Sequence, residues 1–286
     1  MSENLTIRQA YIQGKNRLTE AGLESPAFDA LCLLEPAFGI QNRTDLAMRG
    51  SEIAGIVAVK QYFGMIDRRL REPLQYILGR WEFDGMALAV GDGVLVPRED
   101  TLALVEAAEF SLNGRQAPRI LDLCAGTGAV GLALARRIAG AEVVCVELSD
   151  KALPYLRKNL AEFGRGRVSL AVADVLELPD TAPGTFDGIV SNPPYIPSGD
   201  IAALQWEVHC EPRMALDGGA DGLDFYRAIC ENWTRLLRPG GLVAFEIGYD
   251  IREGVEGIMR QNAINHLSLW EDVGGIDRCI FGTVTR

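Results

Sequence analysis

The sequence of 286 residues is poor in the side chains that build metal centres and disulfide frameworks. It contains two histidines and six cysteines, and no two of the cysteines form a CxxC pair. This spacing argues against structural zinc and against a disulfide scaffold, so we expect no metal site and free thiols in a reducing compartment. The cysteines are Cys32, Cys124, Cys145, Cys210, Cys230 and Cys279.

Long apolar runs are also absent. The longest ones have the length of a strand, such as Leu242 to Phe245, and the opening MSENLTIRQA lacks the basic start and apolar stretch of a signal peptide. With 48% hydrophobic and 23% charged residues, the composition is that of an ordinary globular protein. We therefore expect a cytoplasmic protein that does not bind a membrane.

Positive charge is scarce in the larger part of the chain. Residues 1–80 carry ten Lys or Arg and nine Asp or Glu, so the net charge of −11 for the whole chain leaves −12 for residues 81–286. A phosphate backbone attracts surfaces that are rich in Lys and Arg. The acidic balance of residues 81–286 therefore argues against nucleic acid as the direct substrate.

The sequence pattern changes near residue 80. Before it, apolar residues recur three and four apart, and Ser25-Pro26 is typical of an N-cap followed by a first-turn proline, so we expect a small helical domain over residues 1–80. After it, short β-like runs with glycine turns predict a β-hairpin connection over residues 81–100, within a second domain that covers residues 81–286. The apolar helical stripes are Ile7, Ala10, Tyr11, Gly14 and Leu18, and Ile56, Val59, Phe63, Ile66 and Leu70.

Strand and helix patterns alternate through the second domain, which predicts an α/β fold with a mainly parallel, doubly wound sheet. Ligands of such sheets bind beyond the carboxyl ends of the strands. The predicted strands are Arg119–Leu123, Glu142–Glu147, Val168–Ala173, Gly188–Ser191 and Leu242–Ile247. The predicted helices are Ala129–Ile138, Asp150–Glu162 and Leu223–Leu237.

A glycine loop, Asp122 to Gly131, joins the first of these strands to a helix. Its GxGxxG pattern occurs by chance about 0.4 times in a sequence with this glycine content, so the position of the loop matters more than the match. Glu147 ends the next strand, where an acid can accept both hydroxyls of a ribose, and Asp174-Val175 follows the third strand, at the level of an adenine ring. Nicotinamide dinucleotides and S-adenosylmethionine both fit this arrangement.

The tetrapeptide Asn192-Pro193-Pro194-Tyr195 distinguishes these two cofactors. It arises by chance in about one of two thousand sequences of this composition, and it follows a predicted strand at the same sheet edge as the glycine loop. The Asn192 side-chain oxygen and the Pro193 carbonyl can accept both hydrogens of a planar NH2 group, while the prolines restrict the backbone and Tyr195 offers a flat face. The motif favours methyl transfer to an amide-like nitrogen, which is a poor nucleophile that must be positioned.

Several segments together resemble the PrmC/HemK family, the peptide chain release factor N5-glutamine methyltransferases, and the resemblance extends over nearly the whole chain. The segments are EPLQYILG (Glu72 to Gly79), Val96-Pro97-Arg98, DLCAGTGAVGLALA (Asp122 to Ala135), SNPPYIP (Ser191 to Pro197), Glu211-Pro212-Arg213, Ala215 to Gly219, Asp221-Gly222-Leu223, Tyr226-Arg227, Pro239-Gly240-Gly241 and Glu246-Ile247-Gly248.

This resemblance implies a class I, Rossmann-like methyltransferase domain with a mainly parallel seven-stranded sheet, preceded by an all-helical domain that docks a class I release factor. The enzyme would methylate the glutamine of the GGQ tripeptide with S-adenosylmethionine as its cofactor. We further expect a monomer that does not bind nucleic acid directly. The implied cofactor-binding residues are Cys124, Ala125, Gly126, Thr127, Gly128, Glu147, Asp174, Val175 and Asn192. The implied substrate-binding residues are Asn192, Pro193, Pro194 and Tyr195, of which Asn192, Pro193 and Tyr195 are the candidate catalytic residues.

Three other functions are compatible with parts of the sequence. A nucleic-acid methyltransferase could use the same tetrapeptide on the exocyclic amine of a flipped base, although the acidic balance of the second domain argues against it. A nicotinamide-dependent oxidoreductase would leave the tetrapeptide unexplained. A non-catalytic binding module would leave both Asn192 and Glu147 without a role.

Overall fold

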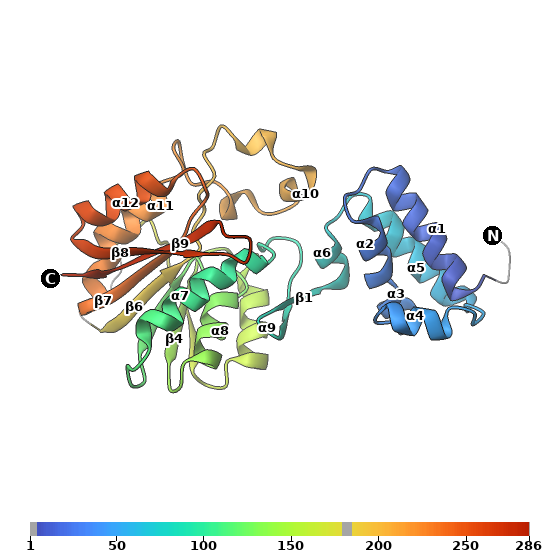
Figure 1. Cartoon of the computed structure of the whole chain (residues 1–286), viewed down its shortest axis with the longest axis horizontal. Coiled ribbons are helices and arrows are strands. Elements are labelled where there is room, and N and C mark those ends of the chain that lie inside the picture. The colour runs from blue at the N-terminus through green and yellow to red at the C-terminus, as the bar shows by residue number, and fades with distance from the viewer. Residues whose placement is uncertain (1–4, 179–184, 286) are drawn as a thin grey trace. The chain divides into compact units, whose positions relative to one another are not determined.

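The structure, a computed structural model, describes residues 5–178 and 185–285 (Figure 1). The chain separates between Gly79 and Arg80 into two compact units. Within the described ranges, no helix is long and apolar enough to cross a membrane. The same ranges contain no group of three His, Cys, Asp or Glu side chains that could hold a metal ion.

The first unit is entirely helical. Its first helix starts at a capping box, in which the Thr6 hydroxyl accepts the Gln9 N–H at 3.2 Å and the Gln9 side chain accepts the Thr6 N–H at 2.9 Å. The second begins at Pro26 after Ser25, as the sequence predicts. The helices are α1 (Ile7–Glu20), α2 (Pro26–Cys32), α3 (Leu34–Phe38), α4 (Arg43–Arg49), α5 (Ile56–Arg69) and α6 (Leu74–Leu78).

Tyr62 of α5 organises the core of this helical unit. Its hydroxyl donates to the Ala30 carbonyl at 3.1 Å, and its ring lies so close to Gly14 that a Cβ there would be 2.4 Å from the hydroxyl oxygen. The predicted apolar stripe of α5 is wrong at its two ends, because Ile56 is 61% exposed and Leu70 is 38% exposed. Ile56 is the first residue of α5 and Leu70 is its C-cap, so both lie at the ends of the helix, where packing is less complete.

The second unit begins with the predicted hairpin, formed by β1 (Arg80–Phe83) and β2 (Met86–Ala89). Asp84 and Gly85 connect the strands and both have positive φ, 50° and 70°, which matches the right-handed twist of a tight hairpin. Arg137 fixes the turn by donating from Nε to the Asp84 carboxylate at 3.1 Å.

The sheet has seven strands in the order β5-β4-β3-β6-β7-β9-β8. Strands β5, β4, β3, β6 and β7 are parallel, while β9 is antiparallel to both β7 and β8. The mainly parallel seven-stranded sheet is thus confirmed. The strands are β3 (Arg119–Leu123), β4 (Glu142–Glu147), β5 (Val168–Val172), β6 (Phe186–Ser191), β7 (Leu237–Glu246), β8 (Ile264–Glu271) and β9 (Asp277–Val284).

Helices cover both faces of this sheet, as Figure 1 shows. One core contains residues of α7, α8 and α9, and the core on the opposite face contains residues of α11 and α12. This layering buries both faces and leaves the carboxyl edge of the parallel strands to the connecting loops. The helices are α7 (Leu102–Leu112), α8 (Ala129–Arg137), α9 (Leu153–Phe163), α10 (Trp206–His209), α11 (Asp224–Ala228) and α12 (Arg252–Gln261), with short turns η1 (Glu99–Thr101), η2 (Ile201–Ala203) and η3 (Arg213–Ala215).

The prediction of one continuous α-helix over Leu223–Leu237 is wrong, because only Asp224–Ala228 form an α-helix there. After α11 the chain continues as a π-helical turn, η4 (Ile229–Trp233), and a 3₁₀ turn, η5 (Thr234–Leu236). The Thr234 hydroxyl donates to the Cys230 carbonyl at 2.8 Å, and such bonding to the preceding turn distorts a helix. Strand β7 then begins at Leu237, five residues before its predicted start.

Candidate active site

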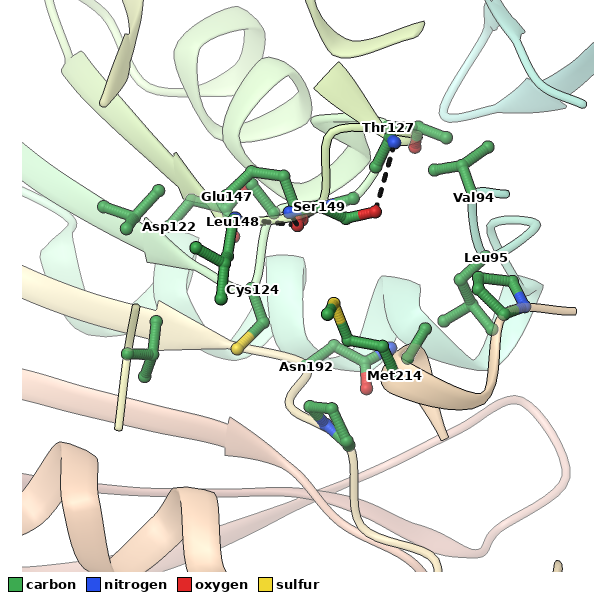
Figure 2. Close-up of a pocket in the computed structure, with 18 of the residues that line it drawn as sticks. Val94, Leu95, Asp122, Cys124, Thr127, Glu147, Leu148, Ser149, Asn192 and Met214 are labelled. Atoms are coloured by element: carbon green, nitrogen blue, oxygen red, sulfur yellow. Dashed lines mark hydrogen bonds between the residues drawn. The ribbon is translucent and has the colours of Figure 1, made fainter. Parts of the chain in front are cut away.

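A pocket at the carboxyl edge of the parallel strands gathers most of the predicted site residues (Figure 2). Because these strand ends meet at one edge, residues far apart in the sequence come together there. The lining residues come from the carboxyl ends of four strands. They lie in the loop after β3, at the end of β4, in the segment after β5 and in the segment after β6. The predicted residues that line the pocket are Cys124, Ala125, Gly126, Thr127, Glu147, Asp174, Val175, Asn192 and Pro194.

Three predicted site residues, Gly128, Pro193 and Tyr195, lie outside the pocket lining. In an extended segment successive side chains point to opposite sides, so Asn192 and Pro194 reach the pocket while Pro193 and Tyr195 point away from it. The Tyr195 ring packs against the core beneath α11 and α12. The roles of the Pro193 carbonyl as an acceptor and of Tyr195 as a flat wall stay predictions.

The glycine loop makes a tight turn between β3 and α8. Gly126 and Gly128 have φ of 55° and 81°, and the Gly128 N–H donates to the Ala125 carbonyl at 2.7 Å. A Cβ at Gly128 would lie 2.6 Å from a methyl carbon of Leu156, whereas a Cβ at Gly126 would meet only Val94, at 3.9 Å, and would project into the pocket. Gly128 therefore shapes the loop, and Gly126 keeps room for a ligand.

Cys124 stands at the start of this loop in the left-handed region, with φ of 59°. An L-residue other than glycine pays roughly 1–2 kcal/mol for this conformation. Burial raises the pKa of the Cys124 thiol, and the nearby Glu147 raises it further. The thiol is therefore protonated at neutral pH and is no candidate nucleophile.

Two buried polar side chains hold the glycine loop in place. The Asp122 carboxylate accepts the Gly131 N–H at 2.8 Å in the first turn of α8, and burial raises the pKa of Asp122 to about 7. The Asn159 amide of α9 donates to the Thr127 carbonyl at 2.9 Å and accepts the Ala89 N–H at 2.7 Å. Asn159 thus joins the loop to the β-hairpin, and no motif in the sequence predicted this role.

The Glu147 carboxylate is the main polar group at the end of β4. One oxygen accepts the Gly126 N–H at 2.7 Å, and the other accepts the N–H groups of Leu148 and Ser149 at 2.9 and 2.7 Å. A carboxylate offers about four lone-pair positions, so these bonds leave about one for a ligand. Glu147 therefore holds the loop backbone in place. Two free lone-pair positions would be needed to accept hydrogen bonds from both ribose hydroxyls, and about one is left.

The NPPY tetrapeptide is fixed to the sheet and to a segment before α7. The Ser191 hydroxyl donates to the Leu123 carbonyl at 2.7 Å, which ties the end of β6 to the start of the glycine loop. Asn192 donates from Nδ2 to the Thr101 hydroxyl at 3.3 Å. These bonds hold Asn192 at the pocket side of β6.

A second loop supports the tetrapeptide from behind. The Ile196 N–H donates to the Leu216 carbonyl, and the Gly218 N–H donates to the Ile196 carbonyl, both at 2.9 Å. A Cβ at Gly218 would lie 2.8 Å from both the Pro194 oxygen and the Tyr195 Cα. The two loops are therefore packed backbone against backbone, which only glycine allows.

Gly222 makes a similar contact and provides a test of this packing. It has φ of 76°, and an added Cβ would lie 2.4 Å from the Tyr195 carbonyl oxygen, so Gly222→Ala is expected to displace the tetrapeptide and to lower the rate of any reaction in this pocket about tenfold or more. Gly166→Ala is the matched control, because Gly166 has φ of 73° and an added Cβ would have nothing within 4 Å. The positive φ should cost both variants about 1–2 kcal/mol of stability in thermal unfolding, and the clash should add to this loss in Gly222→Ala. Equal rates for the two variants would contradict the supporting role.

The pocket also contains residues that no sequence motif had assigned to it. Most of them come from the segment after the hairpin and from the loop around η3, and the Arg98–Glu211 ion pair joins these two segments at 2.6 Å. Burial raises the pKa of Glu211 to about 7, against the lowering effect of Arg98. Both segments belong to the family-like blocks noted in the sequence, which was the available signal. The unassigned lining residues include Val94, Leu95, Val96, Arg98, Thr101, Ser149, Pro212, Met214, Ala215 and Phe225.

The arrangement suits a nucleoside ligand next to a planar nitrogen. Figure 2 shows Asn192 and Met214 on the opposite side of the pocket from Thr127. The glycine turn and Glu147 form a polar part of the pocket, while Val146 and Val175 are apolar and buried. A ribose and a flat base can lie against the first side, and the oxygen of an amide can receive a substrate N–H at the second.

Comparisons with known proteins identify similar sequences for both units. The family model described as a methyltransferase domain matches residues 120–209, and the model of the PrmC N-terminal domain matches residues 9–79. A crystal structure of a methyltransferase from Pyrococcus furiosus, 17% identical, covers 71% of this chain and 90% of its own with a TM-score of 0.51, which shows the shared fold.

Relatives of similar length carry a more specific description. The release factor glutamine methyltransferase of Geobacter sulfurreducens is 38% identical over 98% of this chain and 97% of its own. That of Moorella thermoacetica is 38% identical over 96% of this chain and 97% of its own. These relatives do not favour a nucleic-acid base methyltransferase. The chain belongs to the release factor glutamine methyltransferase family.

Proposed function

We propose that this protein transfers a methyl group from S-adenosylmethionine to the side-chain amide nitrogen, N5, of the glutamine in the GGQ tripeptide of a class I peptide chain release factor, and thereby modulates translation termination. The observation that carries the proposal is the position of Asn192 in the same pocket as the glycine turn and Glu147. We also propose a cytoplasmic location, because release factors act in translation, which takes place in the cytoplasm.

The residues of the pocket fit S-adenosylmethionine, which supplies an electrophilic methyl group when bound. Gly126 leaves space beside the turn, Glu147 presents a carboxylate for a ribose hydroxyl, and Val175 offers an apolar surface at the level of an adenine ring. Asp174 lies next to Val175 and accepts the Leu176 N–H at 2.9 Å, which fixes this segment. Cys124, Ala125 and Thr127 complete the turn.

The tetrapeptide positions the poorly nucleophilic amide nitrogen and stabilises the charge that develops on it. The lone pair of an amide nitrogen is delocalised, so methylation needs a nitrogen that is held in place and a developing positive charge that is stabilised. The Asn192 oxygen and the Pro193 carbonyl each accept one N–H of the glutamine, which achieves both. The methylated nitrogen is acidic enough to release its proton to water, so no general base is required.

Mass spectrometry of a release factor after incubation with S-adenosylmethionine and the purified protein tests the proposal. We expect one added methyl group on the peptide that contains GGQ, and none when that glutamine is replaced by alanine. Methylation of DNA or RNA without any change in the release factor would overturn the proposal. We also propose that the protein acts as a monomer and without nucleic acid, which light scattering and nuclease treatment of the reaction can test.

The role of Glu147 predicts the effect of Glu147→Gln on cofactor binding. A glutamine keeps one acceptor oxygen but turns an NH2 group toward either Gly126 or the Leu148 and Ser149 amides, and it removes the charge. Loss of a charged hydrogen bond costs about 1.5–3 kcal/mol, so the Kd of S-adenosylmethionine should rise roughly 10- to 150-fold in calorimetry. Glu142→Gln, at the other end of β4, is the control and should leave Kd unchanged. An unchanged Kd for Glu147→Gln would contradict the assignment.

A further inference from the structure

Two buried residues from outside the tetrapeptide meet the Asn192 side chain. Thr101 ends the η1 turn before α7, and Glu246 ends strand β7. Each is only 4% exposed. Thr101 lines the pocket beside Asn192 and accepts a hydrogen bond from its Nδ2 at 3.3 Å. Neither residue belongs to the glycine loop or to the tetrapeptide, so the proposed chemistry gives them no role.

The hydrogen bonds among these three side chains have a defined direction. An ionised carboxylate only accepts, and the Thr101 hydroxyl and the Asn192 amide are the side-chain donors that lower the pKa of the Glu246 carboxyl. Thr101 therefore gives its single hydrogen to Glu246 and uses a lone pair of its oxygen to accept from Asn192. This pattern requires the NH2 group of Asn192 to face Thr101 and Glu246, and it leaves Oδ1 at the opposite edge of the planar amide group.

This orientation matters for the reaction, because an asparagine amide looks nearly the same after a half-turn about χ2. With the opposite orientation the Asn192 NH2 group would face the N–H of the glutamine, and two donors would oppose each other. We propose that Thr101 and Glu246 are positioning residues for methyl transfer, which hold the Asn192 amide with its oxygen toward the substrate nitrogen. This inference rests on the proposed function of the same site.

The surroundings of Glu246 make it dependent on these donors. Its Oε2 is buried and has no hydrogen-bond partner among the described residues. The charged groups that face Glu246 are Asp100, which raises its pKa, and Arg278, which lowers it. Arg278 also pairs with Asp100, at 3.1 Å, and with Asp272, at 2.9 Å. Tyr195, Tyr226 and Cys279 are the titratable neighbours whose pKa Glu246 raises.

Protonation of Glu246 should weaken the arrangement. Burial raises its pKa to about 7, so its carboxyl is neutral below this pH and ionised above it. A neutral carboxyl can donate to Thr101, which removes the acceptor that orients the three groups. We therefore expect kcat to rise with pH through about 7 in the natural protein and this rise to be lost in Glu246→Gln. Asp122 and Glu211 titrate in the same range, so the difference between the two profiles is the relevant measurement.

Substitutions at Thr101 test the proposal without changing charge. Thr101→Val keeps the shape of the side chain and removes both hydrogen bonds, so kcat on a GGQ peptide should fall about tenfold while the KM of S-adenosylmethionine changes little. Thr101→Ser restores the hydroxyl and should restore most of kcat. Thr234→Val is the matched control, since Thr234 is a buried threonine whose hydroxyl bonds the Cys230 carbonyl at 2.8 Å in η5, and it should retain kcat within about twofold.

A double substitution distinguishes a positioning role of Thr101 from a general structural effect on kcat. If Thr101 acts through Asn192, then Thr101→Val should cause no further loss of kcat in an Asn192→Ala background. Natural kcat in Thr101→Val, no recovery in Thr101→Ser, or an equal loss in Thr234→Val would overturn the proposal. Absence of methylation of the peptide by the natural protein would instead overturn the proposed function, so the two failures are distinguishable.

Discussion

Asn192→Ala is expected to lower kcat for methylation of a GGQ peptide roughly 30- to 1,000-fold, which corresponds to about 2–4 kcal/mol in the transition state. The substitution removes the side-chain oxygen that accepts one N–H of the substrate, and it leaves only the Pro193 carbonyl to hold the nitrogen. Because this oxygen stabilises charge that develops during the transfer, the loss should appear mainly in kcat and less in the KM of the peptide.

Asn265→Ala is the matched control for this experiment. Asn265 also donates from Nδ2 to a threonine hydroxyl, that of Thr285 at 3.0 Å, but it lies on β8 at the far edge of the sheet. Its replacement should leave kcat within about twofold, since it is a substitution on the surface. Steady-state kinetics with a radiolabelled methyl donor would measure both variants. A natural kcat for Asn192→Ala would contradict the role of the side chain.

The alternation of parallel strands and helices could be predicted from the sequence, because the local residue pattern of each strand matches the structure that it adopts in the fold. Strands β3 and β4 have the predicted bounds, since short apolar runs end at a glycine turn or at a polar residue. The helix α7, and the separate strands β8 and β9, were not placed from the residues. The sequence of α7 is apolar nearly all round, because it is buried between the sheet and its neighbours, so its periodicity is weak.

Site residues that belong to a motif at the end of a strand could be predicted from the sequence. Site residues that are brought together by contacts between distant segments could not. The glycine loop, Glu147 and Asn192 could be placed at one edge from strand order alone. Thr101 could not, since 91 residues separate it from Asn192, and 113 separate Arg98 from Glu211. The motif alone does not predict that the Tyr195 side chain points away from the pocket and against the core, because this direction depends on the alternation of side chains along residues 192–195.

The helical unit contains a buried ion pair. Removing this pair should unfold the helical unit alone, so that the expected role of this unit in docking the release factor can be tested. Arg69 donates from Nε to the Asp29 carboxylate at 2.8 Å, and these residues are 4% and 3% exposed. Arg69→Met leaves the Asp29 carboxylate buried without its guanidinium, and such a loss costs about 3–5 kcal/mol. We expect the helical unit to unfold at lower temperature in calorimetry or in thermal melts followed by circular dichroism.

Arg68→Met is the control on the neighbouring residue, because its pair with Glu72, at 2.7 Å, is exposed and is expected to contribute at most about 1 kcal/mol. Above the melting temperature of the Arg69→Met helical unit, we expect methylation of a short GGQ peptide to stay within about twofold of the natural rate, while methylation of the intact release factor falls about tenfold or more. This difference follows if the helical unit docks the release factor and the second unit alone carries the chemistry, since a short peptide needs only the pocket. An equal fall for both substrates would show that the second unit depends on the helical one for its own fold, and an unchanged rate on the release factor would remove the docking role.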